Sequence, residues 1–151
     1  MSELFDKSIR TLELPRVLQL LSEQAVSPEA KELALAVRPE TDYEDVLRLL
    51  DQTDGARAMI VLRGAPGFSG VKPVKDLLDR ADRGGSLNIP ELIRIGDLLY
   101  AVRRAKEYFN ADNMESTALY SLFLSLHGNR FLEDKIRRCI PDEKTVADAS
   151  S

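Results

Sequence analysis

Few residues of this chain have the types and spacing that catalysis requires. The segment from Gly64 to Gly70 contains three glycines but lacks the Lys-Ser or Lys-Thr pair that grips phosphate and Mg²⁺ in a phosphate-binding loop. Acid pairs such as Asp76 with Asp79 have helical spacing, which is typical of a solvated face, and no neighbouring group is placed to tune their pKa. We therefore predict no catalytic, cofactor-binding or metal-ligating residue in this chain.

The chain has a single histidine and a single cysteine. Cys139 cannot form an internal disulfide, and one histidine is too few for a zinc site of the Cys/His type. We predict that His127, beside Gly128 in a turn, contacts the carbonyl groups of a helix end rather than acting as a general base. Cys139 is expected to be a small buried hydrophobe behind Ile136.

The amino terminus carries acids among its bases and has no signal-like apolar run, and no later run approaches the length of a bilayer span. Together with the cysteine usage, this indicates a protein of the reducing cytoplasm without a membrane partner.

Two basic clusters are the only candidates for contact with nucleic acid. The net charge of −4 argues against a strongly nucleic-acid-binding surface, so DNA or RNA would have to be met locally. Acids such as Glu107 and Glu133 lie among the bases, cations are favoured at helix C-termini, and no aromatic residues are interleaved. Solvated helix ends are therefore the alternative that we favour. The candidate contact residues are Arg103, Arg104, Lys106, Arg137 and Arg138.

The elements that carry these residues are expected to be helices. Pro15, Pro28 and Pro90 stand where a first-turn proline is tolerated. Thr41 and Glu44 have capping-box spacing and predict a long helix over residues 42–62, whose broad apolar arc should be buried. Asp54 and Arg57 lie three apart on that arc, which makes them a candidate buried or interfacial ion pair.

The second half of the chain is predicted to contain four further helices. A glycine-rich loop near residues 64–70, held by Phe68, precedes a short helix over 73–83 that ends at Gly84-Gly85. The strongest periodicity predicts a helix over 90–109, and a polar stretch over 110–115 separates it from a helical hairpin formed by residues 116–126 and 129–140.

These elements predict an all-α, lever- or core-type domain of about six to seven helices over residues 1–140. Two lobes, 1–110 and 116–140, are an alternative to a single domain. Residues 141–151 are expected to be a polar tail or the truncated start of a further segment.

Several pieces of sequence, taken in order, resemble the N-terminal region of the Smr-bearing second branch of the bacterial MutS proteins, the MutS-two family. They are TLELPRVLQLL at 11–21, A-x-S-x-x-x-K-E-L-A at 25–34, Arg38-Pro39, Asp51-x-Thr53-Asp54 and the Gly84-Gly85-x-Leu87 step. Ala30 departs from the pattern, because the family often has glycine there, and alanine should favour the helix. The match is looser after Asn110.

The resemblance implies that this chain is a lever or core segment of a longer parent. Such a parent would be an ATPase and endonuclease that binds branched DNA and suppresses recombination, or that binds rRNA on collided ribosomes and rescues them. ATP and Mg²⁺ would bind the parent's ATPase domain, which would also form the homodimer, and the segment itself would be non-catalytic. A stand-alone helical adaptor that binds a protein partner is the alternative.

Overall fold

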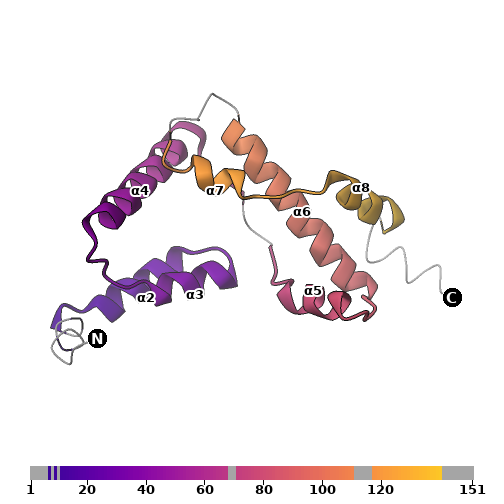
Figure 1. Ribbon diagram of the computed structural model, residues 1–151, viewed down its shortest axis with the longest axis horizontal. Helices are drawn as coiled ribbons and strands as arrows, with labels where there is room; N and C mark the ends of the chain where they lie inside the picture. Colours follow the sequence, from indigo (N-terminus) through magenta and orange to yellow (C-terminus); the bar gives the residue numbers. More distant parts are fainter. Residues whose placement is uncertain (1–6, 8, 10, 68–70, 111–116, 141–151) are drawn as a thin grey trace. The chain divides into compact units, whose positions relative to one another are not determined.

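The computed structural model describes residues 7, 9, 11–67, 71–110 and 117–140 (Figure 1). None of these residues lies in a strand, and the all-α expectation is confirmed. Within the same ranges, no helix has the length and hydropathy needed to cross a membrane. The helices are α2 (Leu14–Gln24), α3 (Pro28–Ala36), α4 (Tyr43–Arg63), α5 (Lys75–Asp82), α6 (Ile89–Asn110), α7 (Tyr120–Leu124) and α8 (Arg130–Cys139).

The chain divides into two units, residues 1–40 and 41–151. The alternative lobe boundary at 110–116 falls inside the second unit, and residues 111–116 lie outside the described ranges. The domain limits inferred from the sequence therefore stay a prediction.

The first unit is built on the pair α2 and α3, which pack against each other. Pro15 and Pro28 lie in the first turns of the two helices, as expected. The N-cap of α3 is Ser27, whose hydroxyl oxygen accepts a hydrogen bond of 3.1 Å from the backbone N–H of Ala30. Leu18, Ser22 and Ala34 are buried in this unit.

The long helix α4 begins one residue later than the predicted capping box implies. Its N-cap is Asp42, and a carboxylate oxygen of Asp42 accepts from the backbone N–H of Asp45 at 3.1 Å. The box predicted from Thr41 and Glu44 is therefore wrong. An aspartate is as good an N-cap as threonine, so local sequence leaves the choice between neighbouring residues open.

The expectation that the apolar arc of α4 is buried is also wrong. Met59 is its one residue described as buried. Asp54 and Arg57 form an ion pair of 3.6 Å, but their side chains are 75% and 81% exposed, so this pair is not buried. The exposed large apolar side chains of α4 are Tyr43, Leu47, Leu49, Leu50, Ile60, Val61 and Leu62.

Residues of α4, α6 and the segment around α7 meet in one apolar cluster. Met59, Phe109 and Leu119 are its buried members. The ring of Phe123 stacks on that of Phe109, with centroids 4.3 Å apart and planes at 16°. The cluster joins Met59 to residues that lie 50 and 60 positions later in the sequence.

Side chains at the ends of α4 and α6 also bind each other's main chain. The Arg63 guanidinium donates to the carbonyl oxygens of Tyr108 and Phe109, and the Tyr108 hydroxyl donates to the carbonyl of Gly64 at 2.8 Å. The last carbonyls of a helix have no partner within it, so Arg63 satisfies acceptors that would otherwise need water. We call these three hydrogen bonds the α4–α6 clasp.

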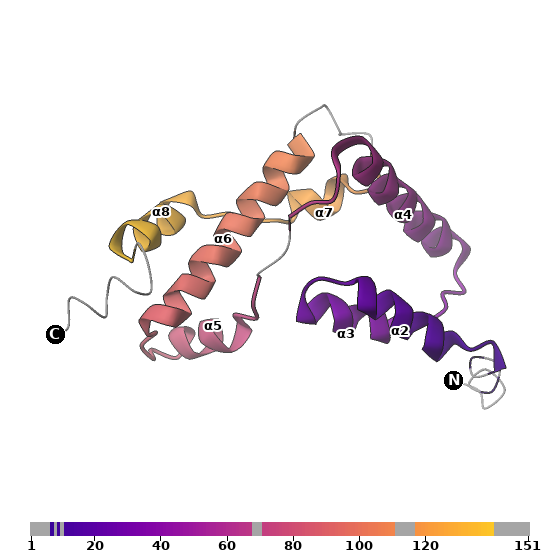
Figure 2. The same ribbon diagram turned by 180° about the vertical axis from the view of Figure 1, so that it is seen from behind.

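A short connection joins α5 to α6 (Figure 2). Gly84 has a φ of 83°, and the backbone N–H groups of Gly84 and Gly85 donate to the carbonyls of Ala81 and Arg80 at 2.9 Å each. This confirms the predicted helix stop. Residues 64–67 are non-helical, but 68–70, with Phe68, lie outside the described residues, so the glycine-rich loop stays a prediction.

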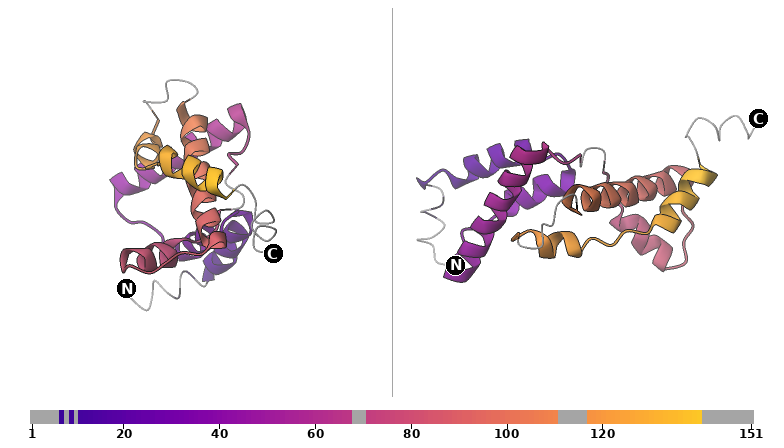
Figure 3. Two further views of the ribbon diagram at one scale, coloured as in Figure 1. Left: turned by 90° about the vertical axis from the view of Figure 1, so that its right-hand side faces the viewer. Right: turned by 90° about the horizontal axis from the view of Figure 1, so that it is seen from above.

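The predicted hairpin of the last two helices is wrong. Both α7 and α8 pack on α6 instead, and α8 has the larger contact (Figure 3). Ile136 of α8 joins Val74 and Ile95 in a second buried cluster, because Gly96 lets it approach the α6 backbone. Cys139 is exposed on α8, so its predicted burial is wrong as well.

Candidate functional site

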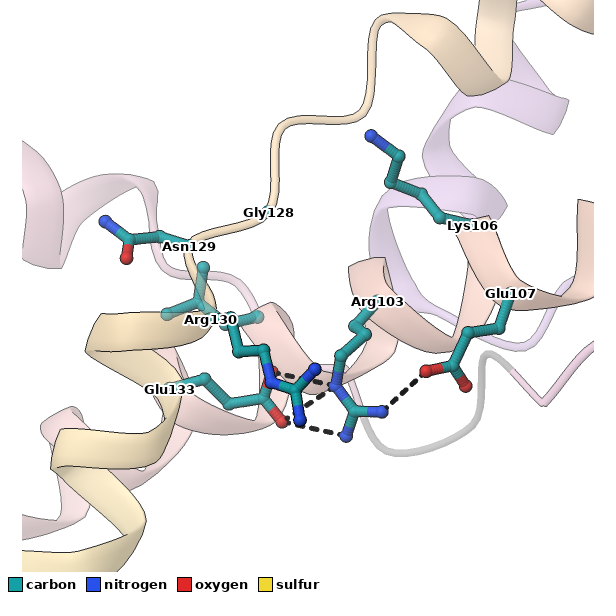
Figure 4. Close-up of a pocket in the computed structure, with 8 residues that line it drawn as sticks. Arg103, Lys106, Glu107, Gly128, Asn129, Arg130 and Glu133 are labelled. Atoms are coloured by element: carbon teal, nitrogen blue, oxygen red, sulfur yellow. Dashed lines mark hydrogen bonds and ion pairs between the residues drawn. The ribbon is translucent and has the colours of Figure 1, made fainter. Parts of the chain in front are cut away.

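Two of the predicted contact residues lie where α8 crosses α6, around a buried carboxylate. Glu133 of α8 is 2% exposed. It accepts hydrogen bonds from Arg103 of α6, at 3.1 Å from Nε to Oε2 and 3.1 Å from Nη2 to Oε1 (Figure 4). Arg137, one turn further along α8, places its Nε 3.9 Å from Glu133 Oε1. The acid therefore lies between two guanidinium groups.

The same Arg103 also binds an acid on its own helix. Its Nη1 lies 2.8 Å from Glu107 Oε1, at the i, i+4 spacing that helices favour. This hydrogen bond is the main reason why the pKa of Glu107 lies below its usual value. The bonds to Glu133 and Glu107 raise the pKa of Arg103, so the guanidinium stays charged at any ordinary pH.

Tyr100 completes the cluster and was not identified from the sequence. The guanidinium carbons of Arg137 and Arg103 lie 4.3 and 5.0 Å from the centre of its ring. A ring face attracts cations, so Tyr100 helps to hold the two arginines close together. The i, i+3 spacing of Tyr100 and Arg103 was an available signal, but the approach of Arg137 depends on how α8 docks.

A pocket of about 280 Å³ opens beside this cluster. Its wall includes Lys106, whose ammonium donates to the carbonyl oxygen of Leu126 at 3.2 Å. Asn129 and Arg130, at the start of α8, form another side. The wall of the pocket carries both positively and negatively charged side chains. In the described part of the chain, no three His, Cys, Asp or Glu side chains gather to hold a metal.

The other two predicted contact residues are placed differently. Arg104 lies 3.4 Å from Glu107 Oε2, and its side chain is 61% exposed. Arg138 is exposed on α8 and is not part of the pocket wall. The structure thus brings Arg103 and Arg137 together around Glu133, places Lys106 nearby, and leaves Arg104 and Arg138 outside. Contact of any of the five with nucleic acid stays a prediction.

His127 lies in the segment between α7 and α8, as expected. Its Nδ1 is 2.7 Å from the carbonyl oxygen of Ser125, just after the end of α7. The expected contact with a carbonyl group at a helix end is confirmed.

Known proteins resemble this chain in sequence along almost its whole length. No family model matches the chain. An endonuclease MutS2 of Ruminiclostridium cellulolyticum is 36% identical over 148 residues. Proteins of the same name from Acetivibrio thermocellus and Agathobacter rectalis are 34% and 35% identical.

These matches cover very different shares of this chain and of its relatives. They cover 96–97% of this chain but 19% of each relative, so the chain spans about a fifth of the length of the curated relatives it matches. The resemblance inferred from the order of the sequence motifs is confirmed. The chain is homologous to one segment of the endonuclease MutS2 proteins.

Proposed function

We propose that this chain is the N-terminal lever or core segment of a MutS-like, ATP-dependent DNA-binding protein and endonuclease. The observation that carries the proposal is the homology to endonuclease MutS2 along 97% of this chain. In this proposal the segment is non-catalytic and transmits movement between the parent's ATPase, which binds ATP and Mg²⁺ and forms the homodimer, and its DNA-binding part. The parent would suppress homologous recombination, and collided ribosomes, bound through rRNA, would be a further substrate.

The packing of α6 and α8 supports a mechanical role. Two helices can transmit movement only if the contacts between their side chains hold them in one arrangement. The fork of Arg103 binds Glu133 through two nitrogen atoms, which fixes the rotation of α8 about its own axis. Gly96 allows close approach of Ile136 one turn away along α8, which fixes the distance between the helices.

The charges of the cluster support a structural role over a catalytic one. Arg103 binds two acids, and Arg137 lies against both Glu133 and the Tyr100 ring. With both of its carboxylate oxygens bound by Arg103, Glu133 serves to hold α8 on α6. In this proposal, nucleophiles and general bases come from another part of the parent.

The test is made in the full-length parent with the substitution Glu133→Gln. This change keeps the size of the side chain and removes the charge that both arginines bind. We expect faster amide hydrogen exchange in α8, unchanged ATP binding, and weaker coupling between ATP hydrolysis and release of branched DNA.

The matched control is Glu107→Gln, which changes an exposed acid bound by the same Arg103 without loosening α8. It should leave the coupling unchanged. If Glu133→Gln loosens α8 in a folded parent while ATP-driven release is as fast as in the wild type, this segment does not transmit movement.

A further inference from the structure

Helix α4 carries a repeating pattern of residues that takes no part in the cluster between α6 and α8. Six of its residues follow each other at alternating steps of four and three, the spacing of the inward positions of a coiled coil. At this spacing the six side chains share one face of the helix, and Met59, the buried residue of α4, lies on the opposite face. The six residues, which we call the α4 seam, are Tyr43, Leu47, Leu50, Asp54, Arg57 and Val61.

The α4 seam is exposed along its whole length. The four apolar members range from 39% exposure at Leu47 to 79% at Val61. An exposed apolar row on a helix that packs elsewhere through Met59 is characteristic of a contact surface.

Two charged residues interrupt the apolar row and indicate what covers it. Within one chain, Asp54 and Arg57 form an exposed pair that contributes little to stability, and neither side chain is needed for the packing of Met59. In a seam, however, a polar position selects the partner and the register. The pair is therefore informative about the occupant.

A second α4 in antiparallel orientation matches these charges. When Asp54 faces Arg57 of the other copy, the two-fold symmetry makes Arg57 face the other Asp54, and Leu50 faces Val61 on either side. A parallel second copy would place Asp54 against Asp54 and Arg57 against Arg57, which is repulsive. Charge and apolar pattern are thus self-complementary in one orientation.

We propose that the α4 seam is a self-association surface on which a second copy of this chain docks antiparallel, with the register set by Asp54 and Arg57. The interface is distinct from the dimer contact expected in an ATPase domain and does not rest on the proposed function. It buries the apolar residues that flank the charged centre and gives two ion pairs across the symmetry axis.

The test uses charge reversal in the 151-residue chain, followed by analytical ultracentrifugation from low micromolar to several hundred micromolar concentration. We expect the wild-type chain to change reversibly from 16.9 kDa to twice that mass. Asp54→Arg alone and Arg57→Asp alone each make both cross-copy pairs like-charged and should raise the dissociation constant by about tenfold or more. An equimolar mixture of the two variants restores opposite charges and should form a mixed dimer.

A matched control is Asp97→Arg, the same charge change at an exposed position of α6, which should leave the dissociation constant unchanged. Circular dichroism of each variant establishes that it is folded. A wild-type chain that stays at 16.9 kDa throughout, single variants that dimerise like the wild type, or a mixture that remains monomeric would each overturn the proposal.

The orientation is tested by disulfide trapping in a Cys139→Ser background. A chain with Leu50→Cys and a chain with Val61→Cys should form a mixed disulfide when combined, and neither should cross-link alone. Rapid cross-linking of the Leu50→Cys chain with itself would indicate parallel helices and would contradict the role given to Asp54 and Arg57.

Discussion

Replacement of Gly96 by alanine tests the central contact of the second unit, the docking of α8 on α6. In a helix interior, alanine is more stable than glycine by about 1 kcal/mol. A Cβ atom on residue 96 would, however, lie 3.1 Å from Cγ2 of Ile136 and 3.8 Å from its Cβ. Such overpacking costs about 1–3 kcal/mol. The two effects oppose each other, and we expect Gly96→Ala to be neutral or to destabilise the chain by up to about 2 kcal/mol.

The contribution of the contact is isolated with Ile136→Ala, which removes the obstructing methyl group. In that background Gly96→Ala should stabilise the chain by about 1 kcal/mol, because the helix preference remains and the clash is gone. The coupling between the two sites is then about 1–3 kcal/mol. The assay is urea unfolding of the four proteins, followed by circular dichroism.

Gly55 provides the matched control within α4. A Cβ atom there would lie 3.6 and 3.7 Å from side-chain atoms of Leu119, which is ordinary contact. Gly55→Ala should therefore give the full stabilisation of about 1 kcal/mol. If Gly96→Ala stabilises the wild-type chain as much as it stabilises the Ile136→Ala chain, Ile136 does not pack on Gly96 and the α6–α8 contact is refuted.

Three further predictions concern other parts of the chain. The hydrogen bond from Arg80 lowers the pKa of Glu91. The ionised carboxylate therefore stabilises the fold at pH values above its ordinary pKa of 4.5, and this contribution is lost as the pH falls below that pKa. Acid titration should destabilise the wild type more steeply than Glu91→Gln. Gly84→Ala should cost about 1–2 kcal/mol in thermal or urea unfolding, since a φ of 83° is strained for an L-residue. Cys139 is exposed and should react with a thiol reagent in the native chain at nearly the rate seen in denaturant, whereas slow reaction would contradict its position on α8.

Helix limits were predictable wherever short-range chemistry decides them. Pro28 and the pair Gly84-Gly85 are local signals of a helix start and a helix stop, and the structure follows both. At the start of α4, two adjacent residues are good N-caps, so propensity alone could not choose between Thr41 and Asp42.

Side-chain partners across helices were not predictable in the same way. Periodicity identifies an apolar face but does not say which neighbour covers it, and so the exposed face of α4 and the separate docking of α7 and α8 on α6 were missed. The sequence does show that acids lie near Arg103 and Arg137. It does not show that Glu133 is the one they share, because that depends on the rotation of α8.

The α4–α6 clasp has a consequence for the order in which the chain folds. Its hydrogen bonds join residues 44 to 46 positions apart, whereas α2 and α3 meet across a three-residue connection. Closing a long loop loses more chain entropy than closing a short one, and contacts between distant residues form more slowly. The pair α2–α3 can thus form while the second unit is still open, and substitutions at Arg63 should slow the later step without changing the earlier one.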